Sequence, residues 1–210
     1  MKIKILNLYG GIGGNVAALD RNIYEITTVE LSPGVAAVYR NRFPTDILII
    51  GDAKEYLLNN YYKFDIIWAS PPCPTHSNVR KILVGHSLSA VYPDMVLYQI
   101  NIFLEHHFKG KWVIENVKSY YKPLIAPTVI IDRHYYWSNF DISVIDVEKT
   151  IKISHCKISD YSHIDFTGYI GRKDTLIRNM VNEKVGLHII SCAADTVPYS
   201  YDKSLFDFMN

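Results

Sequence analysis

A repeated order of short apolar runs and helical segments is the feature that most constrains the fold of this chain. The apolar runs all end on small or polar residues and cover residues 3–8, 26–31, 47–50, 64–69 and 111–114. Segments with helical spacing lie between or after them, at residues 33–43, 54–61 and 92–108. Strands that are apolar throughout and alternate with helices are typical of a parallel sheet that helices cover on both faces. We therefore expect an α/β protein with a mostly parallel sheet.

The pattern changes after residue 121. Residues 129–154 contain several β-rich segments with polar breaks, which predicts antiparallel strands. Residues 155–171 show no periodicity and are expected to be irregular, and residues 173–190 return to helical spacing.

The composition limits the class of protein. A chain of 210 residues predicts one domain, and 49% hydrophobic residues against 20% charged ones suffice for a packed core. The net charge of +1 excludes binding to nucleic acid by overall positive charge, but not by a local basic face. No apolar run reaches the ~18 residues of a membrane span. We expect a cytoplasmic protein, because its three cysteines include no C-x-x-C pair and its sequence shows no signal-peptide pattern. The spacing of the histidines and cysteines predicts no metal site.

Residues suited to ligand binding follow the predicted strands, and in an open α/β sheet ligands bind beyond the carboxyl ends of the strands. The Gly-Gly-Ile-Gly-Gly turn lets backbone amides approach a ligand, or is an ordinary strand–helix turn. Val16 stands where a dinucleotide fingerprint needs a small residue, which disfavours a nicotinamide cofactor. Glu30 is spaced to bind a ribose diol or is a solvated carboxylate, and Asp52 binds a ligand amino group or caps the next helix.

Cys73 is the most informative of these residues, because it lies between prolines in SPPCPTHS at the end of a strand. Prolines fix the backbone there, so the thiol is expected to project into the cleft rather than pack inside the sheet. Glu115, in KWVIENV, should lie at the same edge of the sheet. A thiol beside a carboxylic acid forms a nucleophile and acid pair.

These segments resemble a known family. LNLYGGIGGN, VELSPG, GDAKEYL, DIIWASPPCPTHS and WVIENV resemble, in order, the motifs of cytosine-C5 DNA methyltransferases, and RNMVNEKVGLHII resembles the last motif. The resemblance implies a Rossmann-like S-adenosylmethionine-dependent methyltransferase fold with a small irregular recognition lobe. It divides the chain into a catalytic and cofactor-binding domain at residues 1–137 and 172–210 and a reduced target-recognition region at 138–171.

The resemblance also implies the roles of single residues. Cys73 would attack C6 of a flipped cytosine as a thiolate, and Glu115 would bind the N3 and N4 edge of the base. The residues implied to bind S-adenosyl-L-methionine are Tyr9, Gly11, Ile12, Gly13, Glu30, Leu31, Asp52, Ala53, Pro72, Asn179 and Val181. Those expected to contact nucleic acid are Ser77, Arg80, Lys81 and Asn116, most of them in a loop that would act as a mobile lid.

The sequence departs from the family pattern at several positions. In place of an Arg-x-Arg element, Asp132–Trp137 puts His134 at the second arginine and leaves Arg133 out of phase, so that either side chain could serve the base. Asn7 replaces the acidic residue usual before the glycine turn, which we expect to be tolerated, and Arg172 is a weak candidate for a structural arginine.

The recognition region is the larger departure, because only about 30 residues separate Trp137 from Arg172. Each bidentate base contact supplies about 1–3 kcal/mol, so a short region predicts a short or relaxed target sequence. Four aromatic residues there either face DNA or form a small core, and these are Tyr161, His163, Phe166 and Tyr169.

The sequence thus predicts a compact DNA cytosine-C5 methyltransferase that flips its target base out of double-stranded DNA and acts as a monomer. We expect a prokaryote or phage to encode it, with a role such as restriction–modification. One alternative keeps the chemistry and changes the substrate to transfer RNA. The other is a degenerate cofactor-binding module that partners a longer enzyme.

Overall fold

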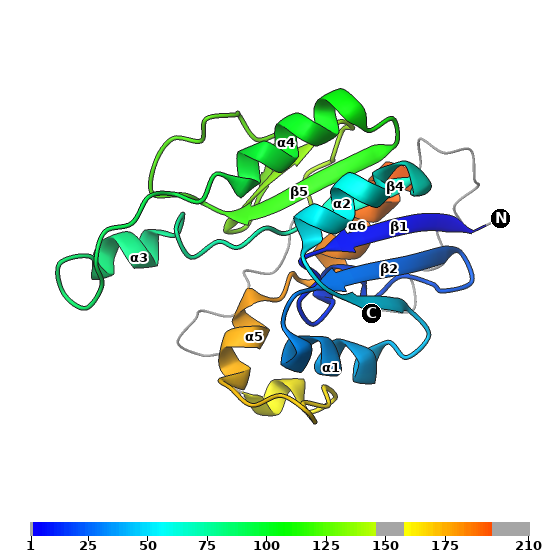
Figure 1. Ribbon diagram of the computed structural model, residues 1–210, viewed down its shortest axis with the longest axis horizontal. Coiled ribbons are helices and arrows are strands. Elements are labelled where there is room, and N and C mark those ends of the chain that lie inside the picture. Colours follow the sequence, from blue (N-terminus) through cyan, green and yellow to red (C-terminus); the bar gives the residue numbers. More distant parts are fainter. Residues whose placement is uncertain (1, 146–157, 195–210) are drawn as a thin grey trace.

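A twisted sheet forms the centre of the molecule (Figure 1). The computed structural model describes residues 2–145 and 158–194, and within them the sheet has seven strands in the order β3-β2-β1-β4-β5-β7-β6. The strands are β1 (Ile3–Leu8), β2 (Tyr24–Glu30), β3 (Ile47–Ile50), β4 (Ile66–Ala69), β5 (Lys111–Val117), β6 (Val129–Ile131) and β7 (His134–Ser138). The first five pair in parallel, while β7 runs antiparallel to β5 and β6. The predicted mostly parallel α/β sheet is confirmed.

Helices cover both faces of the sheet, because its central strands are apolar on both sides. The helices are α1 (Pro33–Arg42), α2 (Ala53–Asn60), α3 (Asn78–Leu83), α4 (Val96–His107), α5 (Lys173–Asn179) and α6 (Glu183–Ala194), with 3-10 turns η1 (Gly14–Val16), η2 (Tyr61–Lys63) and η4 (Ile158–Tyr161). Trp68 and Tyr136 share one core with Ile189 of α6, and Ile67 shares the other with Leu57 of α2 and Leu104 of α4.

The structure divides the predicted helix at residues 173–190 into two helices, which corrects the sequence-based expectation. Asn182 begins the second helix: its side-chain oxygen accepts from the Lys184 amide at 2.9 Å and its carbonyl from the Gly186 amide at 2.9 Å. Val181, just before this cap, is buried in the core against η1 and α6. Asparagine favours a helix N-cap over a helix interior, and this preference explains the break.

Two further boundaries differ from the prediction. Glu115 and Asn116 lie inside β5 rather than beyond its end, because β7 continues the ladder as far as the pair Val117–His134. The segment after Cys73 contains α3, where we expected a loop. Of the β-rich residues 129–154, those described form β6 and β7, and residues 146–154 lie outside the described part of the chain.

The described part of the irregular segment, residues 158–171, packs beneath α1 and α5 (Figure 1). Ile164 and Phe166 are buried with Val38 of α1, and Tyr161 and Tyr169 pack against this cluster. These three aromatic residues therefore belong to a small core, while His163 is exposed. The boundaries 138–171 of a recognition region stay a prediction. No helix among the described residues is long and apolar enough to cross a membrane.

Candidate active site

The main functional candidate is a pocket at the carboxyl ends of β1, β2, β3 and β4. It has a volume of about 500 Å³ and is lined by Tyr9, Glu30, Leu31, Ser32, Asp52, Ala53, Ser70 and Pro72. The strand order reverses between β1 and β4, and such a switch point is where open α/β sheets bind their ligands. The pocket is also of a size typical for small-molecule sites.

The glycine turn forms one wall of this region through its unusual backbone. Tyr9, Gly11 and Gly13 have φ values of 56°, 54° and 77°, in the left-handed region that a tyrosine rarely adopts. The Glu30 carboxylate holds the turn, since it accepts hydrogen bonds from the Gly11 amide at 3.0 Å and from the Ser32 amide at 2.9 Å. A carboxylate offers about four acceptor positions, so Glu30 keeps capacity for a diol.

The rest of the pocket combines a carboxylate with apolar surface. Asp52 caps α2 by accepting from the Glu55 amide at 2.8 Å, so the cap interpretation holds, and the same residue lines the pocket. Leu31 is 66% exposed although it is large and apolar. An apolar wall beside two carboxylates suits a ligand with a flat ring and polar hydroxyl or amino groups.

Five residues expected at the cofactor do not line the pocket as the structure shows it. Ile12 and Val181 are buried, and Asn179 ends α5. Gly11 and Gly13 contribute backbone to the turn behind it. Their roles toward a cofactor stay predictions.

Cys73 follows the pocket residue Pro72 directly and is half-buried. Burial raises the pKa of its thiol, the Glu115 carboxylate raises it further, and Arg133 lowers it. The Glu115 and Arg133 side chains therefore both influence the ionisation of the Cys73 thiol. In the free protein the thiol is held in its protonated form.

Glu115, Tyr136 and His134 lie on one face of the β5–β7 pair. Glu115 is 7% exposed and opposes Tyr136 in the ladder, and His134 lies two residues along the same strand. The His134 Nε2 atom is 3.5 Å from a Glu115 carboxylate oxygen. Burial lowers the pKa of His134, so the imidazole is neutral near pH 7 and contacts Glu115 as a polar ring rather than as a cation.

Arg133 occupies the turn between β6 and β7. Its guanidinium donates a hydrogen bond to the carbonyl oxygen of Arg178 at 2.6 Å, which ties the hairpin to α5. Asp132, the other residue of this turn, has a φ of 50°. The structure thus brings His134 next to Glu115 and directs Arg133 partly toward the protein backbone.

Asn116 has a structural contact in place of the expected nucleic-acid contact. Its side chain is 1% exposed and donates to the Pro71 carbonyl at 2.9 Å. A buried amide that is already bonded cannot reach a nucleic acid without breaking this contact. Asn116 therefore holds the Pro-Pro-Cys segment against β5.

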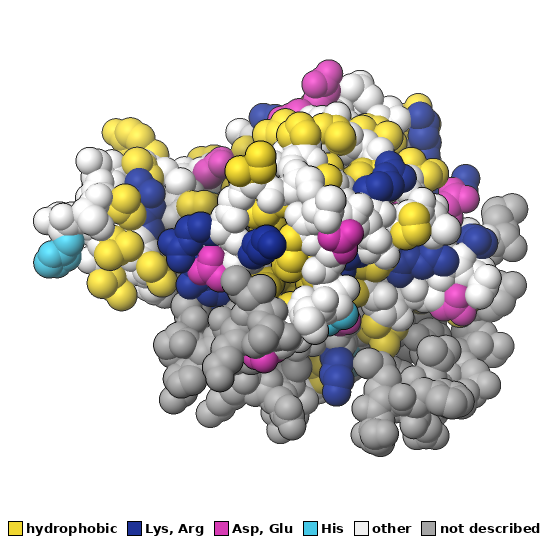
Figure 2. Space-filling view, turned by 90° about the horizontal axis from the view of Figure 1, so that it is seen from below, with side chains coloured by type: hydrophobic (Ala, Val, Ile, Leu, Met, Phe, Trp, Pro, Cys, Tyr) yellow, Lys and Arg dark blue, Asp and Glu magenta, His cyan; other side chains and the backbone are white. Residues whose placement is uncertain are grey.

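The other three residues expected at nucleic acid lie on an arm that projects from the body beside the Cys73 segment (Figure 1). Ser77 caps α3, Arg80 donates to the Ser89 carbonyl at 3.2 Å, and the Lys81 ammonium lies 5.8 Å from the centre of the Tyr120 ring. Apolar side chains gather on the arm (Figure 2), among them Ile82 at 70% and Tyr92 at 95% exposed.

His76 is a residue that the sequence did not single out. Its amide donates to the Cys73 carbonyl at 3.0 Å, and its carbonyl accepts from the Tyr120 amide at 3.1 Å. The buried ring places Nδ1 2.6 Å from the Tyr121 hydroxyl. These contacts join the Cys73 segment to the chain after β5, and no sequence signal marks them because the partners lie 45 residues apart.

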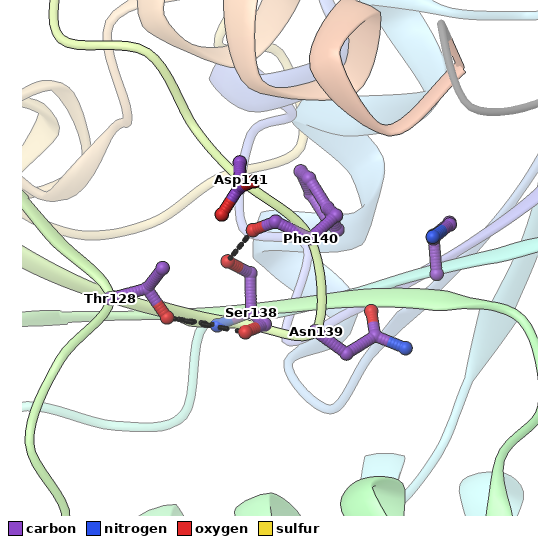
Figure 3. A pocket seen from close by; sticks show the side chains of 6 residues that line it. Thr128, Ser138, Asn139, Phe140 and Asp141 are labelled. Atoms are coloured by element: carbon purple, nitrogen blue, oxygen red, sulfur yellow. Dashed lines mark hydrogen bonds between the residues drawn. The ribbon is translucent and has the colours of Figure 1, made fainter.

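A second hollow, of about 380 Å³, lies at the opposite end of β5 and β7 (Figure 3). Its polar side chains bond to nearby backbone: the Thr128 hydroxyl bonds to the Ser138 amide and carbonyl, and the Asn139 side chain bonds to the Trp112 amide and the Gly110 carbonyl. It is therefore a structural corner rather than a ligand site. Among residues 2–145 and 158–194, no three His, Cys, Asp or Glu side chains are grouped as metal ligands would be.

Comparisons with known proteins identify the family of the chain. A family model described as C-5 cytosine-specific DNA methylase matches residues 3–123. Among solved structures, a mutant of DNMT2 from Spodoptera frugiperda is 31% identical over 56% of this chain and 36% of its own, with a TM-score of 0.38. The SAM-dependent methyltransferase from Agrobacterium tumefaciens is 15% identical over 58% of this chain and 40% of its own, with a TM-score of 0.42. The methyltransferase EhMeth from Entamoeba histolytica is 15% identical over 76% and 64%, with a TM-score of 0.43. No curated protein matches, and the chain spans 36% of the length of the DNMT2 structure.

Proposed function

Because the chain belongs to the family of C-5 cytosine-specific DNA methylases, we propose that it transfers a methyl group from S-adenosylmethionine to C5 of cytosine in double-stranded DNA. The observation that supports this most directly is the placement of Cys73. It follows a residue that lines the pocket, and its thiol interacts with the Glu115 carboxylate.

S-adenosylmethionine is the cofactor that this family implies, and the sheet order is that of its Rossmann-like fold, as predicted. The pocket residues fit the cofactor: Glu30 has acceptor positions left for the ribose hydroxyls, and Leu31 and Pro72 offer apolar surface to the adenine ring. When bound, the cofactor supplies the methyl group.

In the proposed mechanism, Cys73 acts as the nucleophile. Its thiolate attacks C6 of the cytosine, and the C5=C6 electrons become available at C5. After C5 has gained the methyl group, loss of the C5 proton restores the double bond and expels the thiolate. Because the free protein holds Cys73 as a thiol, the mechanism requires that substrate binding or Arg133 promote its ionisation.

Glu115 would bind the N3 and N4 edge of the base and withdraw electron density from the ring, which makes C6 more electrophilic. His134 Nε2 lies 3.5 Å from one carboxylate oxygen of Glu115 and would help to orient the group. The base must leave the duplex to reach these residues, at a cost of a few kcal/mol.

Methyl incorporation from labelled S-adenosylmethionine tests the proposal. The protein is incubated in parallel with unmethylated genomic DNA and with unmodified transfer RNA, and 5-methylcytosine is mapped by bisulfite sequencing. We expect methylation of DNA at a short common sequence. Cys73→Ser should abolish incorporation and leave S-adenosylmethionine affinity unchanged, whereas Glu115→Gln should reduce turnover more than DNA binding.

Two results would redirect the proposal. Incorporation into transfer RNA alone would keep the chemistry and replace the substrate. Cofactor binding without incorporation into either would favour a module that needs a partner chain, an alternative suggested by the missing Arg-x-Arg element and the short recognition region. A covalent trap with 5-fluorocytosine DNA separates this last case, since only an active Cys73 forms the adduct.

A further inference from the structure

A second cysteine lies in a polar cluster away from the pocket. His188 and Cys192 stand one turn apart on α6, beside Ser143 in the segment after β7. The Cys192 Sγ atom is 3.7 Å from His188 Nε2 and 3.9 Å from the Ser143 hydroxyl oxygen. Both His188 and Cys192 are half-buried, while the neighbouring Ile189 and Ile190 face the core.

The hydrogen-bond geometry assigns the protons in this cluster. His188 Nε2 is 2.7 Å from the Ser143 carbonyl oxygen, and a carbonyl only accepts, so Nε2 carries a hydrogen. The carbonyl and the cysteine sulfur, at 2.7 Å and 3.7 Å, share this one N–H, from which the sulfur can only accept, and the Ser143 hydroxyl is also able to donate to the sulfur. Donors on two sides stabilise a thiolate rather than a thiol.

The two described cysteines thus occupy opposite environments. Cys73 is surrounded by apolar surface and a carboxylate, which raise its pKa. The hydrogen bond from His188 lowers the pKa of Cys192, and the same contact raises the pKa of His188. A partly exposed cysteine whose sulfur accepts hydrogen bonds and whose pKa is lowered is the setting in which cysteines react with oxidants.

We propose that Cys192 is a modification site for hydroperoxides, separate from the nucleophile of the methyl-transfer reaction. The Cys192 thiolate attacks the hydroxyl oxygen of the hydroperoxide, the O–O bond breaks, and the sulfur is oxidised to sulfenic acid. The departing alkoxide, or hydroxide from hydrogen peroxide, takes a proton from solvent and leaves as an alcohol or water.

Site-resolved mass spectrometry tests this assignment on the folded protein. Hydrogen peroxide with a sulfenic-acid trap, and iodoacetamide in a parallel series, are applied near pH 7. We expect Cys192 to react faster than Cys73 with both reagents. His188→Gln should slow the reaction of Cys192 by about threefold, because the sulfur loses a hydrogen-bond donor, and a roughly tenfold smaller thiolate fraction is partly offset by the greater nucleophilicity of each thiolate. His163→Gln, an exposed histidine elsewhere, is the matched control and should change nothing.

A measurement on the unmutated chain guards against a misfolded variant. The pH midpoint of Cys192 alkylation in the folded protein should lie below that of the same cysteine in urea. An equal or higher midpoint, or a Cys192 that reacts no faster than Cys73, would overturn the proposal.

Discussion

Asn7 offers the sharpest test of how this chain departs from its family. The Asn15 amide donates to the Asn7 oxygen at 2.9 Å, and the Asn7 amide donates to the Thr28 hydroxyl at 3.2 Å. The Thr28 hydroxyl donates to the Tyr39 hydroxyl at 2.6 Å, which in turn donates to the Asp46 carboxylate at 2.8 Å. Asn7 is 1% exposed, so this directional chain has no water to replace a missing partner.

Asn7→Asp restores the acidic residue usual in the family, yet we expect it to destabilise this protein. A carboxylate cannot donate, so the Thr28 hydroxyl must turn toward it. The oxygens of Thr28 and Tyr39 would then face each other at 2.6 Å with no hydrogen between them, since Tyr39 donates to Asp46. Losing one hydrogen bond costs about 1 kcal/mol and an unsatisfied buried polar contact about 1–3 kcal/mol, which sums to about 2–4 kcal/mol at pH 7.

The loss of folding stability caused by Asn7→Asp should be larger at high pH than at low pH. Burial raises the pKa of the introduced carboxyl above its unfolded value near 3.9, so the folded state binds the proton more tightly. Protonated, the group donates again and the chain of hydrogen bonds is restored. Stability is therefore retained below the unfolded pKa and lost as pH rises toward the folded pKa.

Urea unfolding of wild type and Asn7→Asp at pH 8 and pH 5 measures both effects. With a slope of about 3 kcal/mol per molar urea, the expected loss lowers the midpoint by about 1 M at pH 8, and by less at pH 5. Asn22→Asp, the same change at an exposed position, is the control. Equal midpoints for wild type and Asn7→Asp at pH 8, or a difference that grows toward pH 5, would refute the reasoning.

Two further predictions concern the catalytic segment. Asn116→Leu removes the hydrogen bond to the Pro71 carbonyl and should lower kcat for methyl transfer at least tenfold, with little change in S-adenosylmethionine affinity. An equal loss of kcat and of cofactor affinity would show a general folding defect. Because burial and the Glu115 carboxylate raise the pKa of Cys73, its alkylation rate should still be rising at pH 9, and Glu115→Gln should move that pH midpoint downward, which an unchanged profile would contradict.

The sheet and its ligand edge could be predicted because both follow from local order along the chain. Apolar runs at residues 3–8 and 47–50 coincide with β1 and β3, and turns after the strands supply the lining residues Tyr9, Glu30 and Asp52. A parallel sheet brings its carboxyl ends together whatever the helices between them contain. The pocket was thus predictable without any knowledge of tertiary contacts.

The residues that position Cys73 were not predictable in this way. Asn116 and Pro71, like His76 and Tyr121, meet across 45 residues of sequence. Each is an ordinary polar or aromatic residue, and its role depends on which partner the fold brings opposite. The helix cap at Asn182, inside an apolar helical pattern, was likewise not predictable, because periodicity indicates a helix but not where a side chain interrupts it.

In the hairpin of β6 and β7, the alternation of side chains along a strand determines which residue contacts Glu115. Side chains two residues apart on a strand share a face, so His134 must follow Tyr136, and Tyr136 opposes Glu115. Arg133 lies in the turn before β7, where this alternation does not apply, and its guanidinium reaches the Arg178 carbonyl. With this register, the alternation places His134 on the face of Glu115, where the two side chains are 3.5 Å apart, and so decides between His134 and Arg133, which the sequence left open. The same alternation cannot predict the bond from Arg133 to the Arg178 carbonyl, because the position of α5 depends on packing against α1 and the glycine turn.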